Sequence, residues 1–302
     1  MIISDLKNFK EKFKSDIYFN FDIKKLNWFN IGGKCKVFFK PKSLNELQNF
    51  LKLYSNRSKM FILGFGSNVL FSDNLYDGVI IKLSNNFATL SKLNNATIIA
   101  GSSCSQKKVS EYAMANNISG LEFMYCIPGS IGGGLKMNSG CFGTEFKDKL
   151  ISLQCIDTDG NLKVIPAKNI KFKYRSIVLD ENLIFLSATF KGNKSDKKNI
   201  KIRMDEFAKK KNNSQPSKIK TGGSTFKNPI NQTKKKAWQL IKETVPRNIN
   251  FGDAHISEKH FNFFVNKKNA TFNEMISLIE YVRTNVKENT GINIELEIKV
   301  VE

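Results

Sequence analysis

Two glycine-rich segments have the residue types that bring a bare backbone close to a phosphate group. The first, ILGFGSNVLFSD, ends a short apolar run with Gly64 and Gly66, then continues with Ser67 and Asn68. Glycine accepts positive φ angles and has no side chain, so successive backbone amides can approach phosphate oxygens there. A Rossmann fingerprint is absent, because no GxGxxG opens a helix with an acidic residue about 20 positions further on. Taken alone, the segment is also consistent with an ordinary glycine turn.

The second segment, IPGSIGGGLKMNSGCFGTE, runs from Ile127 to Glu145 and contains six glycines: Gly129, Gly132, Gly133, Gly134, Gly140 and Gly143. Such density indicates backbone pressed against a ligand. Pro128 fixes the entry, while Ser130, Asn138 and Ser139 offer hydrogen bonds to a polar cofactor. A purely structural omega-loop is the alternative interpretation.

Other kinds of chemistry find little support. The five cysteines form no CxxC pair, and the two histidines, His255 and His260, lack metal-ligand spacing, so we expect reduced thiols and no metal site. The net charge of +21 suggests nucleic-acid binding, but the lysines are spread along the whole chain rather than clustered. We therefore expect no nucleic-acid partner, and instead a positive field that attracts anionic ligands such as nucleotides.

Neither export nor membrane insertion is expected. Residues 1–20 mix charged side chains with apolar ones and contain no signal-peptide core. The longest apolar stretches, such as residues 60–63 and 79–81, fall far short of the roughly 20 residues that span a bilayer.

The elements that must position the glycine segments alternate between strand and helix patterns. Strands are predicted at residues 36–40, 60–63, 78–83, about 96–101 and 183–192, with a hairpin at residues 151–167 around Asp159-Gly160. Helices are predicted at residues 43–56, 105–116, 195–211, 235–244 and 272–288. We expect the segment from Gly120 to Gly143 to be irregular, and residues 292–301 to form a closing strand.

Ordered motifs across nearly the whole chain resemble the UDP-N-acetylenolpyruvoylglucosamine reductase family. They are NxxxIGG (residues 27–33), LGxGSN (63–68), IPGSIGG (127–133), MNxG (137–140), FxYRS (172–176), GGSTFKNP (222–229), AWxLI (237–241), SEKHxNF (257–263) and ELEIKVV (295–301). The resemblance implies an α+β fold: a vanillyl-alcohol-oxidase-type (PCMH-type) FAD-binding domain of two α+β subdomains, residues 1–85 and 86–208, plus a substrate-binding subdomain, residues 209–302. The region between Ser176 and Gln215 lacks a long inserted loop, which indicates the shorter family branch.

Family membership would make the chain a flavoprotein oxidoreductase with FAD and NADPH as cofactors. The implied reaction reduces UDP-N-acetylglucosamine enolpyruvate to UDP-N-acetylmuramate, with hydride passing through flavin N5 to C3 and a proton added at C2. This is a step of peptidoglycan synthesis, and hence of cell wall biogenesis, cell shape, cell division and the cell cycle. A cytoplasmic monomer is expected.

The resemblance also assigns three catalytic residues. Arg175 would stabilise the enolate, because its guanidinium stays charged and can hold a carboxylate with two parallel hydrogen bonds. Ser224 would donate the proton to C2, and Glu297 would assist both. Glu295, two positions earlier on the same expected strand face, is the open alternative to Glu297.

The remaining site residues are likewise implied by the resemblance. Tyr174, Lys227 and Asn228 would contact the substrate. Cofactor binding is expected from Gly64, Gly66, Ser67, Asn68, Val69, Ile127, Pro128, Gly129, Ser130, Gly132, Gly133, Asn138 and Gly140. Two alternatives stay open: another FAD oxidase or dehydrogenase on the same fold, and a basic nucleic-acid-binding protein.

Overall fold

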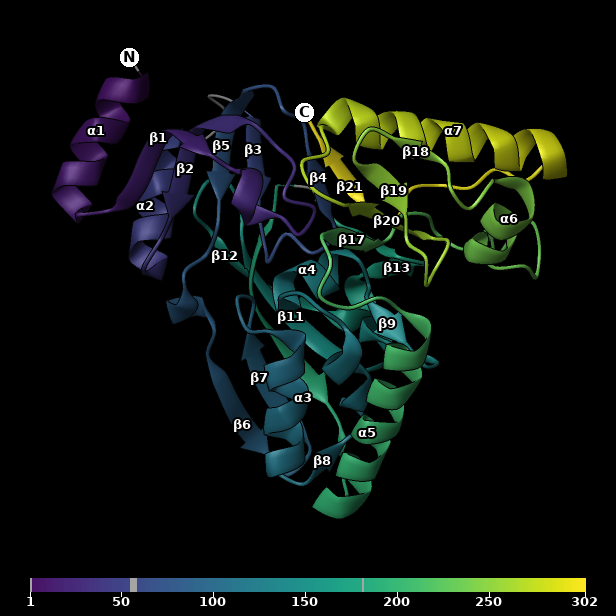
Figure 1. Cartoon of the computed structure of the whole chain (residues 1–302). Helices are drawn as coiled ribbons and strands as arrows, with labels where there is room; N and C mark the ends of the chain where they lie inside the picture. The colour runs from purple at the N-terminus through teal and green to yellow at the C-terminus, as the bar shows by residue number, and fades with distance from the viewer. Residues whose placement is uncertain (1, 55–58, 181) are drawn as a thin grey trace. The chain divides into compact units, whose positions relative to one another are not determined.

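A computed structural model describes residues 2–54, 59–180 and 182–302 of the chain (Figure 1). The described residues group into two compact units. Unit 1 comprises residues 1–19, 37–65 and 77–211, and unit 2 comprises residues 20–36, 66–76 and 212–302. The division into three subdomains at residues 85 and 208 stays a prediction. Among the described residues, no helix is long and apolar enough to cross a membrane.

The first part of unit 1 is a four-stranded sheet with two helices. The strand order is β1-β2-β5-β3, and β3 runs parallel to β5. The bounds are α1 (Ile2–Phe13), β1 (Asp16–Asp22), β2 (Lys34–Lys40), α2 (Leu44–Tyr54), β3 (Lys59–Ile62) and β5 (Tyr76–Ile81). Phe9, Phe39 and Phe50 pack ring to ring in the core beneath the sheet.

The start of α2 is fixed by capping hydrogen bonds of Ser43 and Glu46. The hydroxyl of Ser43 accepts a hydrogen bond from the backbone N–H of Glu46 at 3.1 Å, and the Glu46 carboxylate accepts from the N–H of Lys42 at 2.6 Å. The predicted helix is confirmed, although its predicted last residues, 55 and 56, lie outside the described residues.

The second part of unit 1 is a five-stranded antiparallel sheet in the order β12-β11-β15-β7-β6. It confirms the hairpin around Asp159-Gly160 as β11 and β12. The bounds of its helices are α3 (Gln106–Ala115), α4 (Ile131–Lys136) and α5 (Lys197–Ser214). Its strands are β6 (Leu90–Asn94), β7 (Thr97–Gly101), β8 (Ile118–Ser119), β9 (Gly140–Cys141), β10 (Thr144–Glu145), β11 (Leu150–Ile156), β12 (Leu162–Pro166), β13 (Lys171–Lys173), β14 (Ser176–Val178), β15 (Ile184–Lys191) and β16 (Asn193–Lys194).

The glycine-rich segment contains the short helix α4, so the expectation of wholly irregular backbone from Gly120 to Gly143 is wrong. Ser130 caps this helix by accepting a hydrogen bond from the N–H of Gly133 at 3.2 Å. Close packing explains why residue 134 is a glycine, because a Cβ there would lie 2.6 Å from the ring of Phe146. Here, tertiary packing outweighs the low helix propensity of glycine.

Unit 2 is a four-stranded antiparallel sheet, β17-β20-β19-β18, with helix α7 packed on β18 and β19 (Figure 1). The bounds are β4 (Val69–Phe71), β17 (Thr221–Ser224), α6 (Ala237–Thr244), β18 (Asn250–Phe251), β19 (Ala254–Ile256), β20 (Phe263–Asn266), α7 (Phe272–Thr290) and β21 (Lys299–Val301). Helix α7 confirms the predicted helix. A capping box of Thr271 and Glu274 starts it, and Gly291 ends it at φ 71°.

The closing strand expected over residues 292–301 is shorter than predicted. Only Lys299–Val301 forms a strand, β21, which pairs in parallel with β4. Upstream of it, Leu296 makes a single bridge to Phe226. The segment forms no continuous strand because Leu296 pairs with Phe226 whereas Lys299–Val301 pair with β4. Local periodicity does not reveal such a change of partner.

Candidate active site

The two glycine-rich segments approach each other within unit 1. A Cβ added to Gly64 would lie 2.5 Å from the hydroxyl of Ser130, so a side chain there would have to displace this hydroxyl. The amine of Lys82 donates to the carbonyl of Gly64 at 2.5 Å, and burial lowers the pKa of this lysine. Gly129, which precedes Ser130, has φ 128°, a conformation that also requires glycine.

A polar group without a partner lies beside the second segment. Ser102 follows β7, is 5% exposed and has no hydrogen-bond partner for its hydroxyl among the described residues. A Cβ on Gly132 would lie 3.2 Å from the Cβ of Ser102. A buried hydroxyl normally has a partner, so bare glycine backbone with an unsatisfied hydroxyl fits a polar ligand such as a diphosphate. Sequence reasoning missed Ser102; its position after Gly101 at a strand end was the available signal.

Asn138 is a predicted cofactor residue whose side chain is engaged by the protein. It is fully buried. Its amide nitrogen donates to the Glu145 carboxylate at 3.0 Å and to the Lys173 carbonyl at 3.2 Å, and its oxygen accepts from the N–H of Lys147 at 3.0 Å. Asn138 therefore holds the loop together. Its contact with a cofactor stays a prediction.

Arg175 lies at the tip of the hairpin formed by β13 and β14, beside Tyr174. Its guanidinium lies 4.9 Å from the Tyr174 ring centre, donates to the carbonyl of Gly140 at 3.2 Å and is 3.6 Å from a Glu145 oxygen. Arg175 has φ 57°, a left-handed conformation that disfavours side chains other than glycine, asparagine or aspartate. Backbone strain of this kind is often found at functional positions.

In unit 2, a β-bulge sets the position of Ser224. Thr221 pairs with Val265 and Ser224 pairs with Phe263, so β17 has one residue more than β20 between these pairs. The extra length falls on Gly222 and Gly223, and Gly223 has φ 81°. A Cβ on Gly222 would collide with the ring of Phe29. Bulges of this kind redirect the side chain that follows them.

Glu297 is held beside the residue that follows Ser224. Its backbone N–H donates to the carbonyl of Thr225 at 2.8 Å, next to the bridge between Phe226 and Leu296. The structure thus brings Ser224 and Glu297 together in unit 2, while Arg175 belongs to unit 1.

Glu295 has a different environment from Glu297. Its side chain is 77% exposed and forms an ion pair with the amine of Lys227 at 3.2 Å. Glu297 is only partly exposed. Since a solvated ion pair contributes little to a site, these contacts favour Glu297 over its neighbour.

Asn262 is a buried residue that sequence reasoning missed. Its side-chain oxygen accepts from the N–H of Phe226 at 2.9 Å, and its amide donates to the carbonyl of Phe226 at 2.8 Å. Its own carbonyl accepts from the N–H of Thr225 at 2.8 Å. Asn262 therefore fixes the backbone directly after Ser224. Its place within the motif SEKHxNF was the signal.

The other predicted residues of unit 2 are spread along the same segments. Gly66 has φ 68°, and a Cβ there would collide with the carbonyl of Leu26. Val69 belongs to β4 and pairs with Lys299, while Ser67 is partly exposed. The side-chain oxygen of Asn228 accepts from the N–H of Ala237 at 3.0 Å, at the start of α6.

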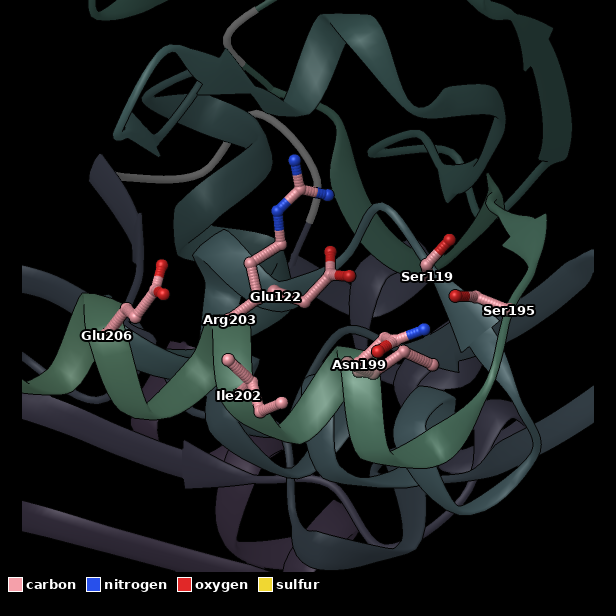
Figure 2. Close-up of a pocket in the computed structure, with 8 residues that line it drawn as sticks. Ser119, Glu122, Ser195, Asn199, Ile202, Arg203 and Glu206 are labelled. Atoms are coloured by element: carbon pink, nitrogen blue, oxygen red, sulfur yellow. The ribbon is translucent and has the colours of Figure 1, made fainter.

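A pocket of about 230 Å³ in unit 1 contains none of the predicted residues. Figure 2 shows Asn199, Ile202, Arg203 and Glu206 projecting from α5 on one side of it. Glu122 is buried there and accepts from the N–H of Gly120 at 2.7 Å. Across the described ranges, no group of three or more His, Cys, Asp or Glu side chains could hold a metal ion.

Comparison with known proteins identifies the family of the chain. The family model for the C-terminal domain of UDP-N-acetylenolpyruvoylglucosamine reductase matches residues 215–301, and the model for an FAD binding domain matches residues 35–165. A UDP-N-acetylenolpyruvoylglucosamine reductase of Pelagibacter ubique (strain HTCC1062) is 55% identical over 302 residues, which is 100% of both chains. The chain belongs to the UDP-N-acetylenolpyruvoylglucosamine reductase family.

More distant members of the UDP-N-acetylenolpyruvoylglucosamine reductase family match over nearly the same length. The enzyme of Rickettsia massiliae (strain Mtu5) is 41% identical over 290 residues, 96% of each chain. The crystal structure of the Thermus caldophilus enzyme has a TM-score of 0.81 and 27% identity, covering 95% of this chain and 99% of that one. These matches confirm the predicted family, the α+β fold with an FAD-binding domain, and an FAD-binding oxidoreductase.

Proposed function

We propose that this chain is a monomeric cytoplasmic enzyme that uses NADPH to reduce UDP-N-acetylglucosamine enolpyruvate to UDP-N-acetylmuramate. The product is a precursor of peptidoglycan, so the reaction would serve cell wall biogenesis, cell shape and cell division. The observation that carries the proposal is the 55% identity to the Pelagibacter ubique reductase over its complete length.

FAD fits the bare backbone around Gly64 and Gly132 and the unpartnered hydroxyl of Ser102. When bound, FAD would supply the chemistry of hydride transfer between NADPH and C3 of the enolpyruvyl ether. Gly64, Ser130, Gly132 and Gly133 would line the site, where their small or absent side chains let the cofactor approach the backbone and the Ser130 hydroxyl could donate to it. Gly66, Ser67, Asn68, Val69, Ile127, Pro128, Gly129, Asn138 and Gly140 complete the proposed cofactor set.

Arg175 would bind the carboxylate of the enolpyruvyl group. When C3 gains a hydride, negative charge spreads over C2 and this carboxylate as an enolate. A permanently charged, planar guanidinium stabilises that charge more strongly than it stabilises the substrate. The ring of Tyr174, 4.9 Å from the guanidinium, would form part of the same substrate contact.

Ser224 would deliver the proton that C2 requires, and Glu297 would help to hold the donor and the enolate. The bulge before Ser224 and the bond from Glu297 to Thr225 support this pairing of roles. A serine hydroxyl is a weak acid, so it can act only next to a strongly basic carbon. Lys227 and Asn228 would contact polar oxygens of the nucleotide sugar.

Purified protein, NADPH and UDP-N-acetylglucosamine enolpyruvate provide the test. Loss of NADPH absorbance that depends on the nucleotide sugar, in a yellow flavin-containing preparation, supports the proposal. A yellow protein that oxidises NADPH at the same rate without the nucleotide sugar would instead be another flavin oxidase. A colourless protein that takes up no FAD would overturn the flavoenzyme assignment.

A further inference from the structure

Glu145 occupies a central place among the polar groups around Arg175. It lies on β10, directly opposite Gly140 on β9. Its carboxylate accepts from the amide of Asn138 at 3.0 Å and lies 3.6 Å from the Arg175 guanidinium. The side chains of Glu145 and Arg175 are 20% and 19% exposed, so water only partly screens their attraction.

Arg175 is held from two directions by the pair that β9 and β10 form. One terminal nitrogen faces Glu145, and the other donates to the carbonyl of Gly140 at 3.2 Å. A Cβ on Gly140 would lie 2.6 Å from the Cγ of Glu145, so the two strands are tightly packed there. The guanidinium is therefore bound to a rigid hairpin rather than left to rotate on its four-bond stem.

A carboxylate beside this guanidinium has two opposing effects. It restricts the direction of the guanidinium, which favours a reaction that depends on geometry. It also offsets part of the positive charge, which weakens attraction for an anionic substrate. A group that orients Arg175 should therefore raise kcat without lowering KM.

We propose that Glu145 is a positioning residue that acts through Arg175 and fixes the guanidinium for the enolate. This inference rests on the role proposed above for Arg175. In this proposal Glu145 acts on the guanidinium rather than on the reacting atoms. Its carboxylate accepts from Asn138 at 3.0 Å, faces Arg175 at 3.6 Å and lies 3.0 Å from the exposed amine of Lys147.

The test replaces Glu145 with glutamine, which keeps the shape and the oxygen that accepts from Asn138 but removes the charge. In Glu145→Gln, we expect kcat for the enolpyruvyl substrate to fall roughly tenfold or more, because one charged contact is lost. KM for this anionic substrate should stay constant or fall. Bound FAD and the rate of flavin reduction by NADPH should stay within about twofold of the wild type.

Lys147→Met is the matched control, because it removes the exposed partner of the same carboxylate and should leave kcat unchanged. A Glu145→Gln enzyme that loses FAD, or whose KM rises while kcat is kept, would show a merely structural role and overturn the inference. Arg175→Lys separates the two proposals. If Arg175→Lys is impaired while Glu145→Gln is not, only the inference fails; if neither is impaired, the proposed role of Arg175 fails as well.

Discussion

The side-chain amide of Asn68 donates to the backbone carbonyl of Glu297 at 2.9 Å, across 229 positions of sequence. The N–H of the same Glu297 donates to Thr225, and the N–H of Lys299 donates back to the carbonyl of Asn68. The peptide that carries the Glu297 side chain is therefore fixed on both sides. The loop predicted to bind the cofactor and the residues predicted to protonate the substrate share one hydrogen-bonded framework in unit 2.

Ser224→Ala should separate the two halves of the reaction. Flavin reduction by NADPH should stay within about twofold of the wild type, while enolpyruvyl turnover should fall by about two orders of magnitude or more, as general acids typically contribute that much. Stopped-flow measurement of each half-reaction checks this. Ser217→Ala, at an exposed serine of the same segment, is the control. Equal loss in both halves would contradict the assigned role.

Glu297→Gln and Glu295→Gln should differ strongly, because their surroundings differ. Glu297 is held beside Thr225, whereas Glu295 is 77% exposed and forms a solvated ion pair with Lys227. We expect steady-state kcat to fall about tenfold or more for Glu297→Gln, and to change less than about twofold for Glu295→Gln. The reverse order would move the role to Glu295.

Asn262→Ala should destabilise the protein. The substitution leaves the N–H and carbonyl of Phe226 buried without their side-chain partners, at a cost of about 2–3 kcal/mol in the free energy of unfolding. Chemical denaturation measures this cost, with Asn269→Ala at an exposed position as the control. Because the backbone after Ser224 would loosen, activity should fall in the folded fraction too. Unchanged stability would contradict the assigned bonds.

Arg175→Gly should be more stable than Arg175→Ala, although both should be inactive on the enolpyruvyl substrate. The two variants lose the same guanidinium contacts, but only glycine adopts φ 57° without steric cost. The difference in the free energy of unfolding should be about 1 kcal/mol in favour of glycine. Equal stabilities from urea titrations would mean that this backbone conformation carries no strain.

Acidification should destabilise the protein through its histidines. Burial, and then the charge of Lys236, lowers the pKa of His260, whose Nδ1 accepts from the N–H of Asn262 at 3.2 Å. Burial and the charge of Lys267 lower the pKa of His255 as well. The unfolded chain then binds protons more readily, so stability is fully present above about pH 6.5 and is lost as the pH falls through the lower folded values.

His260→Asn tests this pH dependence, because the asparagine oxygen can replace Nδ1 as an acceptor. Between about pH 7.5 and 5.5, a range that brackets the ordinary histidine pKa, the free energy of unfolding of this variant should vary less than that of the wild type. These are the only two histidines in the sequence. In the variant that also carries His255→Asn, the free energy of unfolding should therefore change little across this pH range. An unchanged slope in both variants would assign the effect to carboxylates instead.

Local signals predicted much of the fold. The turn at Asp159-Gly160 specifies a hairpin, and Ser43 with Glu46 specifies the start of a helix through hydrogen bonds between nearby residues. Helix α4 was missed because its glycines oppose helix formation, and the contacts that stabilise it, such as that between Gly134 and Phe146, come from outside the helix.

The sequence predicted which residues form the candidate site, but not the hydrogen bonds and ion pairs that hold them. The motifs marked Arg175, Ser224 and Glu297, yet nothing local distinguishes Glu297 from Glu295 until the pairing with Thr225 is known. Glu145 contacts Arg175, and Asn262 bonds to Phe226; both partners are about 30 or more positions away in sequence. Spacing identifies candidates, whereas the supporting contacts depend on tertiary structure.

The parallel pairing of β21 with β4 has a consequence for how the protein is made. Strand β4 emerges from the ribosome early, and the three residues that pair with it, Lys299–Val301, are synthesised far later. Until then, the apolar strand Val69–Phe71 has no β21 to pair with, and neither Asn68 nor Ser72 has its partner from the end of unit 2. Because strands so far apart in sequence pair slowly, β4 keeps an unpaired edge for longer, and such an edge can pair with other chains and aggregate. The pairing of β4 with β21 can therefore form only after Val301 has been synthesised, so this part of unit 2 is completed at the very end of chain synthesis.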